Sequence, residues 1–307
     1  MRPHPVPLLK GEGTKPLPPL GEGEDGVCFG DAKPRRKKPA VLRVVFAIML
    51  LCVNAEVFAQ DTLLLPVNVP LIRSLPNSAF AVGEKLVFDV GFSFITAGEA
   101  VFEIPQIDTV SDRPCYRVVF TVNSTPSFSW IYRVEDRYET SVDVQGLFPW
   151  RFSQKIREGK YSRDFQAEFD QINNVARTTE GIFPIPPYVQ DIVSALYYTR
   201  TFDFAEFQVG QKVYMENFYK DSTYSLGIKF LGRQKIDVDA GVFNCIIAEP
   251  LIKEGGLFKS EGRVLIWMTD DERKIPIKVS TQVVVGSIVA ELREYSGIQG
   301  TIRAKVK

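Results

Sequence analysis

Hydrophobic and polar residues alternate through most of the chain beyond residue 80. In KLVFDVGFSF, every second residue from Leu86 to Phe94 is apolar. A period of two places these residues on one face of a half-buried strand. The alternation recurs in YRVVFTV, WIYRVEDRY, WRFSQKI, YSRDFQAEF, KVYMENFY, TYSLGIKF, FNCIIAE, RVLIWM and SIVAELREY. Gly, Pro, Asp and Asn separate the runs, so the pattern predicts about ten to twelve antiparallel strands and no parallel β-α-β unit.

One segment breaks this pattern. From Val189 to about Phe202, apolar residues recur at helical spacing, and Asp191 is placed to cap the first turn. The predicted fold is therefore all-β: a strongly curved antiparallel sheet or partial β-barrel with one packed α-helix. The sheet either curls around the helix or carries it on an open face.

The N-terminal region has the composition of an export signal. A basic run at 33–38 precedes an apolar run at 44–53, and small or apolar residues lead to Ala59. We expect cleavage between Ala59 and Gln60. The apolar run is about ten residues long, whereas a membrane span needs about 20, so no transmembrane span is expected in the mature chain. Bulky residues before Cys52 argue against lipidation.

These features divide the chain into five parts. Residues 1–40 are Pro- and Gly-rich and predicted to be disordered; either translation starts near Val41 or this is a long leader. Residues 41–59 form the signal core and cleavage site, 60–78 an extended Pro-containing arm, 79–298 a single β domain and 299–307 a C-terminal tail. We expect export to the periplasm or the outer membrane.

Charge argues against a nucleic-acid partner. Nine of the 37 Lys and Arg and six of the 37 Asp and Glu lie in residues 1–59, which leaves 28 against 31 in the mature chain. A chain this balanced lacks the basic surface that nucleic acids require.

Histidine is almost absent. The single histidine is His4, ahead of the predicted cleavage site. Its loss removes Ser-His-Asp and Cys-His catalysis and His-ligated zinc. The acidic run after Thr269 lacks the spacing of a calcium loop and is interpreted as a turn. No catalytic residue, metal or cofactor is predicted, and enzymatic activity is uncertain and disfavoured.

Two cysteines remain after cleavage, Cys115 and Cys245. An exported protein meets an oxidising compartment, where they could form a disulfide closing a long loop. The alternative is two separate buried thiols on different strands.

Three predicted strands place polar groups among aromatic residues. Buried charges are costly unless they are paired, so an aromatic-lined face with a few polar groups is a candidate ligand site. The alternatives are an internal ion pair of Arg163 with Asp136 or Glu158, polar groups at the rim of the sheet, a carboxylate pair of the kind that cleaves glycosides, and ordinary core packing of the tryptophans. The candidate ligand-binding residues are Trp130, Tyr132, Asp136, Trp150, Gln154, Glu158 and Arg163.

Several sequence segments together resemble those of a known protein family. They are VGEKLVFDVGFSFITAGEAVFEI, VEDRYETSVDVQGLFPWRF, IREGKY, QDIVSALYYTR, AGVFNCIIAEPL and EGRVLIWMTDDERKIPIKV. Over about Phe80 to Gly297 the chain is similar to the exported bacterial family catalogued as domain of unknown function 3108. This resemblance implies a periplasmic or envelope β protein of Gram-negative bacteria. The motifs are structural, so the resemblance assigns no functional residues.

Three functions follow as hypotheses. The first is a protein that binds or carries an apolar or amphipathic envelope ligand, a lipid or a lipid-linked glycan. The second is a non-enzymatic interaction module that docks an envelope protein through sheet edges or the arm. The third is a carboxylate-based glycan hydrolase.

Overall fold

The computed structural model describes residues 72–92, 95–251, 263–282 and 287–307. The predicted signal, with Ala59 and Gln60, and residues 60–71 of the predicted arm lie outside the described residues. All described residues belong to one compact unit.

The described residues form one antiparallel sheet of fourteen strands, which confirms the all-β prediction. More strands form than the ten to twelve expected, partly because β7 and β8 have four residues each, too few for an alternation to be recognised. The strands are β1 Lys85–Phe92, β2 Ile95–Val110, β3 Arg113–Ser124, β4 Glu135–Asp143, β5 Pro149–Glu158, β6 Tyr161–Asp170, β7 Val175–Thr178, β8 Gly181–Pro184, β9 Lys212–Tyr219, β10 Ser222–Val238, β11 Gly241–Leu251, β12 Val264–Thr269, β13 Pro276–Gln282 and β14 Ser287–Ser296.

The strand order follows the chain in two runs. The order is β8-β7-β6-β5-β4-β3-β2-β1-β14-β13-β12-β11-β10-β9, so pairing of β1 with β14 joins the two runs. The edges are β8 and β9, and the sheet does not close through backbone hydrogen bonds. The connection between these edges contains the helix α2 (Ile192–Thr199).

Side chains bridge the gap between the two edges. The Phe218 ring on β9 lies 5.7 Å from that of Phe169 and 6.0 Å from that of Phe183. Gln190, just before α2, pairs with β9 through bonds from its N–H to Glu216 O and from Phe218 N to its own carbonyl, each 2.8 Å. The sheet is thus an open barrel whose gap is spanned by packing and one short backbone bridge.

Register shifts accompany the curvature of the sheet. β10 shifts register against β11 between Phe230 and Gly232, where Gly232 has φ +124°. Glycine suits this position because a side chain at such a φ would be strained. An extra residue in one strand bends it and increases its twist.

α2 begins where the sequence predicts. Asp191 is the N-cap, its carboxylate accepts from Val193 N and Ser194 N, and the Ser194 hydroxyl accepts from Asp191 N to complete a capping box. The helix ends at Thr199, three residues before the predicted end. A second helix, α1 (Pro126–Ser129), is a single turn and was not predicted, because four residues show no periodicity.

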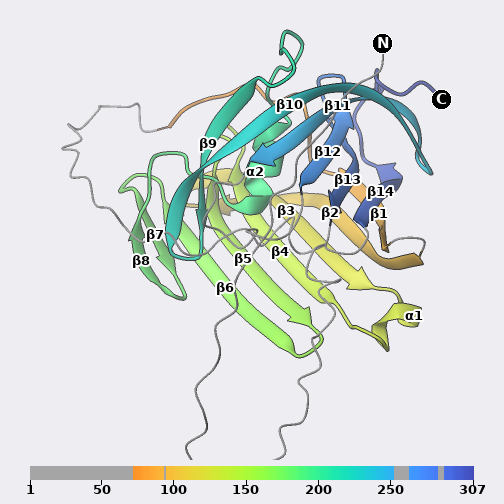
Figure 1. The fold of residues 1–307 in the computed structure, drawn as a ribbon. Coiled ribbons are helices and arrows are strands. Elements are labelled where there is room, and N and C mark those ends of the chain that lie inside the picture. The colour runs from red at the N-terminus through yellow and green to blue at the C-terminus, as the bar shows by residue number, and fades with distance from the viewer. Residues whose placement is uncertain (1–71, 93–94, 252–262, 283–286) are drawn as a thin grey trace, which may run out of the picture. The chain divides into compact units, whose positions relative to one another are not determined.

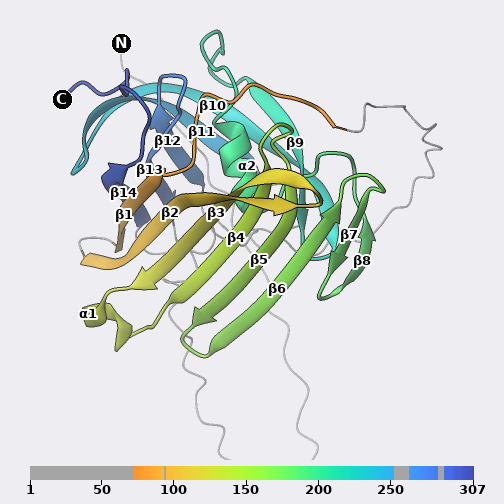
Figure 2. The same cartoon turned by 180° about the vertical axis from the view of Figure 1, so that it is seen from behind.

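α2 lies against the concave face of the sheet. Figures 1 and 2, seen from opposite sides, show it between β9–β12 and β2–β6. Tyr197 belongs to the larger core cluster, whereas Ala195 belongs to a second cluster with residues of β9 to β12. Thr140 on β4 donates a 2.6 Å hydrogen bond to Asp191, and this bond fixes the start of the helix.

A buried ion pair fixes the other end of α2. Arg200 is the C-cap, and its guanidinium donates to both carboxylate oxygens of Glu84 at 2.6 and 2.8 Å. The two side chains are 0% and 2% exposed. Arg200 also donates to the carbonyls of Ala79 and Arg273 at 2.9 and 3.1 Å. One side chain therefore joins the helix, the residues before β1 and the β12–β13 turn.

The segments flanking the predicted domain also pack against it. Arg73, in the described part of the predicted arm, donates to Gly146 O at 2.7 Å and lies over the rings of Tyr188 and Tyr198. The residues predicted as a tail pair with β11, since Asn244 N donates to Ala304 O at 2.9 Å. The folded unit thus extends beyond residues 79–298 at both ends.

The disulfide that the sequence left open does not form. Cys115 and Cys245 are buried free thiols on β3 and β11, with five strands between them in the sheet. A disulfide needs Cα atoms within about 7 Å, which that strand order prevents. The alternative of two separate buried thiols is therefore the observed one.

The acidic run is a turn between β12 and β13. The carboxylate of Asp271 accepts from the Thr269 hydroxyl at 2.8 Å and from Arg273 N at 3.1 Å, which shapes the turn. Within the described ranges, no group of three or more His, Cys, Asp or Glu is arranged to hold a metal ion.

We predict that the buried pair dominates the electrostatic contribution to stability. Replacing Arg200 by Met leaves Glu84 buried and unpaired, and should lower the free energy of unfolding in urea by about 3–5 kcal/mol. Arg303→Met removes a pair with Glu272 in which the arginine is 72% exposed, so it should leave the free energy of unfolding nearly unchanged. Equal losses for the two variants would contradict this role of Arg200.

Candidate functional site

Three of the predicted site residues meet on the face of the sheet that carries α2. Asp136 on β4 and Gln154 and Glu158 on β5 are 2%, 1% and 5% exposed. Gln154 pairs in register with Tyr138, two residues from Asp136. Strand alternation points all of them inward, as the sequence predicts.

The Asp136 side chain hydrogen-bonds to the backbone of the neighbouring strand β5. Its Oδ1 accepts from Arg157 N at 2.7 Å. Its Oδ2 and both amide atoms of Gln154 have no hydrogen-bond partner among the described residues. Burial, with a further contribution from the neighbouring Glu158 carboxylate, raises the pKa of Asp136 to about 8, although the Arg157 hydrogen bond opposes this. Asp136 is therefore mostly protonated at neutral pH.

Arg163 pairs with neither of the carboxylates that the sequence left open as partners, Asp136 and Glu158. It pairs with Glu180 at 2.7 Å and donates to the Tyr219 hydroxyl at 3.2 Å. Because Tyr219 is on β9 and Arg163 on β6, this contact helps to bridge the gap between the sheet edges.

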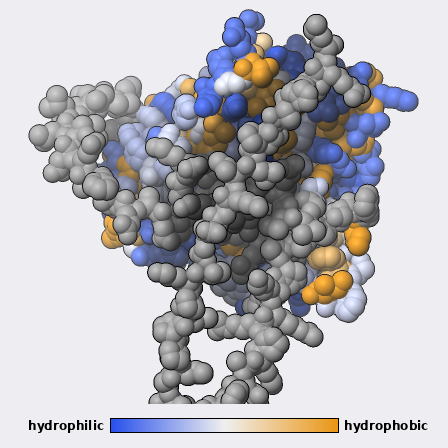
Figure 3. Space-filling model, in the orientation of Figure 1, coloured by the Kyte–Doolittle hydropathy of each residue, from blue (hydrophilic) through white to orange (hydrophobic). Residues whose placement is uncertain are grey.

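Trp130 lies apart from the other predicted site residues. It is the C-cap of α1 and 83% exposed, and the adjacent Ile131 is 62% exposed. Figure 3 shows hydrophobic surface at the lower right, the corner where Figure 1 places α1. Tyr132 follows and packs partly buried against the main core. Neither residue lines the cavity between α2 and the sheet that is described below.

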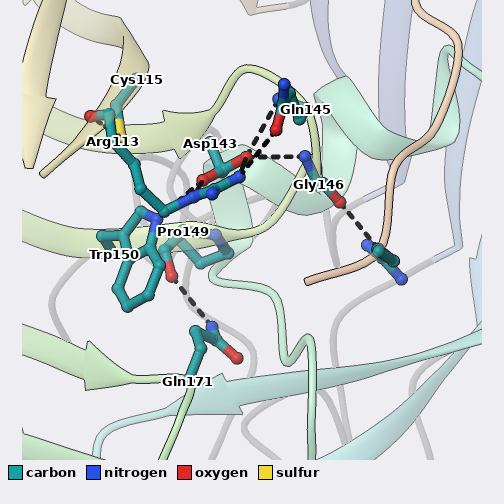
Figure 4. A network of polar contacts seen from close by, with 9 residues as sticks. Arg113, Cys115, Asp143, Gln145, Gly146, Pro149, Trp150 and Gln171 are labelled. Carbon is teal, nitrogen blue, oxygen red and sulfur yellow. Dashed lines mark hydrogen bonds and ion pairs between the residues drawn. The ribbon is translucent and has the colours of Figure 1, made fainter. Parts of the chain in front are cut away.

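Trp150 belongs to a separate polar network, shown in Figure 4. Its indole N–H donates to Asp143 at 3.0 Å, and Arg113 and Gly146 N also donate to that carboxylate. Burial alone would raise the pKa of Asp143, but the hydrogen bonds from Arg113, Trp150 and Gly146 outweigh it and hold the pKa below its usual value. Gln171 supports the same region by donating to Pro149 O at 2.9 Å. Trp150 is thus part of the structural framework.

A cavity of about 140 Å³ lies elsewhere, between α2 and the concave face of the sheet. Asp136, Gln154 and Glu158 do not line it. Its walls come from α2 and from strands of both runs. The lining residues are Phe88, Val90, Ala100, Phe102, Phe120, Ile192, Val193, Ala195, Leu196, Thr199, Asn217, Tyr224, Leu226, Ile228, Ala248, Pro250, Val264, Ile266, Met268, Pro276, Val279 and Ala290.

Only three of these 22 residues have polar side chains: Thr199, Asn217 and Tyr224. The Thr199 hydroxyl donates to Ala195 O at 2.8 Å, within its own helix. The Tyr224 hydroxyl donates to Asn217 Oδ1 at 2.8 Å. A concave, apolar wall with very few polar groups is typical of small-molecule sites.

Sequence reasoning missed this cavity because it searched for polar residues among aromatic ones. A different signal was present. Ala100, Ala248 and Ala290 occupy positions on β2, β11 and β14 that line the cavity. Small side chains at such positions leave space opposite a helix, but sequence cannot show that these three strands face the same helix.

A family model described as "Protein of unknown function (DUF3108)" matches residues 87–293. A β-barrel-like protein of the domain of unknown function DUF1849 from Brucella abortus is 12% identical, with a TM-score of 0.48, and the match covers 73% of this chain and 98% of that one. The hypothetical protein CT021 from Chlamydia trachomatis is 8% identical, with a TM-score of 0.32, covering 72% and 90%. No curated protein matches.

Asp136 predicts a pH dependence of stability. The unfolded carboxyl loses its proton near pH 4, whereas the folded one keeps it to about pH 8. The contribution of this group to the free energy of unfolding is therefore fully present below about pH 4 and is lost as the pH rises to about 8. In urea unfolding from pH 4 to 9, Asp136→Asn should remove this decline and be more stable than wild type at pH 9.

Glu135→Gln is the control for this experiment. Glu135 is the neighbour on the opposite face, and its side chain is 50% exposed. Its substitution should leave the decline as in wild type. A decline that persists unchanged in Asp136→Asn would show that another group causes it.

Proposed function

The chain belongs to the DUF3108 family, and we propose that it is a non-enzymatic binding protein of the bacterial envelope. Its ligand is an apolar or amphipathic molecule, such as a lipid or a lipid-linked glycan. The apolar part of the ligand occupies the cavity between α2 and the sheet. The signal-like segment at residues 33–59 supports export to the periplasm or the outer membrane.

The observation that carries this proposal is the apolar lining of the cavity. Apolar cavities of about 150 Å³ stay dry and bind molecules such as benzene. Atoms that line an unfilled space lack packing partners on one side, and an apolar ligand that fills the space supplies those contacts.

A carboxylate-based hydrolase has less support. Its candidate residues, Asp136 and Glu158, are buried beside each other and do not line the cavity. Burial also raises the pKa of Asp136 to about 8, and this carboxyl already accepts a hydrogen bond from the backbone N–H of Arg157. Asp136 therefore has a structural task.

A protein-interaction module also has less support. Strand addition needs a free edge with several unpaired backbone groups. The edge strand β8 has only four residues, and Gln190 already bonds to the backbone of the other edge strand, β9. Both edges thus offer little room for a partner strand.

We predict that filling the cavity abolishes ligand binding. Ala248 is 1% exposed and lines the cavity, so Ala248→Leu places three extra carbon atoms in the space. The protein would be exported through its own signal, purified from periplasm, and weighed by native and denaturing mass spectrometry. Wild type should carry extra mass that denaturation releases, and Ala248→Leu should be bare while unfolding at the same or a higher temperature.

Ala205→Leu is the matched control, because it adds the same atoms at an exposed position. This variant should retain the ligand. A bare native mass for wild type, or equal ligand occupancy in Ala248→Leu and wild type, would count against the cavity as the binding site.

A further inference from the structure

The cavity wall contains one unused hydrogen-bond donor. Asn217 on β9 is 2% exposed and lines the cavity. It pairs in register with Tyr224, whose hydroxyl donates to Asn217 Oδ1 at 2.8 Å. The amide oxygen is therefore occupied. The amide nitrogen, Nδ2, has no acceptor within the part of the chain that the structure describes.

This unmet donor is unlike the other polar groups of the cavity. The Thr199 hydroxyl gives its proton to Ala195 O, and the Tyr224 hydroxyl gives its proton to Asn217. Nearly all buried polar groups in proteins have a hydrogen-bond partner, and an unpaired one destabilises the fold. A ligand in the cavity could supply the acceptor that Nδ2 lacks.

We propose that Asn217 donates a hydrogen bond from Nδ2 to a carbonyl oxygen of the bound molecule, which is a neutral acyl compound. An ester or an amide of a fatty acyl chain fits both parts of the site. Its hydrocarbon contacts the apolar wall, and its carbonyl oxygen accepts the Asn217 N–H. This inference rests on the proposed function and specifies its ligand class.

The absence of charge in the wall indicates a neutral ligand. None of the described residues that line the cavity is Lys, Arg, His, Asp or Glu. A carboxylate or an ammonium group would lose its hydration there without gaining an opposite charge, which is strongly unfavourable. Removing a carbonyl oxygen from water costs far less than removing an ion, and the hydrogen bond from Asn217 Nδ2 offsets that cost. Ionised fatty acids are therefore disfavoured relative to their esters and amides.

The test compares two probes that share a carbon chain and differ in one carbonyl group. Binding of n-heptane and 2-heptanone to the purified full-length protein would be measured by depletion from the headspace. Asn217→Leu should weaken 2-heptanone about fivefold relative to n-heptane, as expected for one lost hydrogen bond. Heptanoate at pH 7, measured by competition, should bind wild type more weakly than 2-heptanone does.

Asn244→Leu is the matched control. It makes the same substitution at an exposed position of β11 that does not line the cavity, so the ratio of the two affinities should stay as in wild type. If Asn217→Leu does not fold, Asn217→Ala takes its place with the same expected loss.

The outcomes separate this inference from the proposed function. If wild type binds both probes and the Asn217 variant leaves their affinity ratio unchanged, the donor role is overturned and the cavity remains a binding site. Equal binding of heptanoate and 2-heptanone overturns the neutral ligand. If wild type binds neither probe and its native mass is bare, the proposed function itself fails.

Discussion

The fixed position of α2 within the curved sheet is the constraint on which the rest of the structure depends. Polar contacts set both ends of the helix: Thr140 holds the N-cap Asp191, and Glu84 holds the C-cap Arg200. These groups are buried, so each contact is costly to break once the partners are out of water. Apolar packing alone would let a helix slide or tilt to fill space. The anchored ends prevent that adjustment, which is why a cavity persists beside Leu196.

The open sheet explains why the helix is needed. In a closed barrel every strand pairs with two neighbours, so no backbone groups are left unpaired at an edge. This sheet instead ends at the edge strands β8 and β9. The chain crosses from one edge to the other through α2, so the connection fills part of the concavity that it crosses. Phe218 and the Arg163–Tyr219 contact complete the gap with side chains. The result is a barrel-like sheet whose interior contains α2 and, beside it, the apolar cavity.

Sequence periodicity predicted which face of each strand is buried, but it could not predict what lies opposite. The inward side chain of Asp136 and the N-cap role of Asp191 follow from local spacing, and both are confirmed. The partner of Arg163 depends on strand order and proved to be Glu180. Trp130 was misplaced because the alternation in WIYRVEDRY already begins at Trp130, directly after α1, whereas the strand begins at Glu135. The cavity depends on alanines of β2, β11 and β14 lining the same space beside α2, which no local pattern encodes.

Two kinds of buried polar group have different roles in this fold. Asp136 bonds to a backbone N–H of the neighbouring strand and so belongs to the sheet, whereas the free N–H of Asn217 belongs to the cavity wall. The position of Asn217 is also tied to that of the helix. Gln190 bonds to the backbone on both sides of Asn217 and directly precedes the N-cap of α2. One short segment therefore sets both the helix that bounds the cavity and the donor that faces it. A ligand that shifted α2 would also shift Asn217. The apolar contacts of the ligand and its hydrogen bond to Asn217 therefore depend on each other.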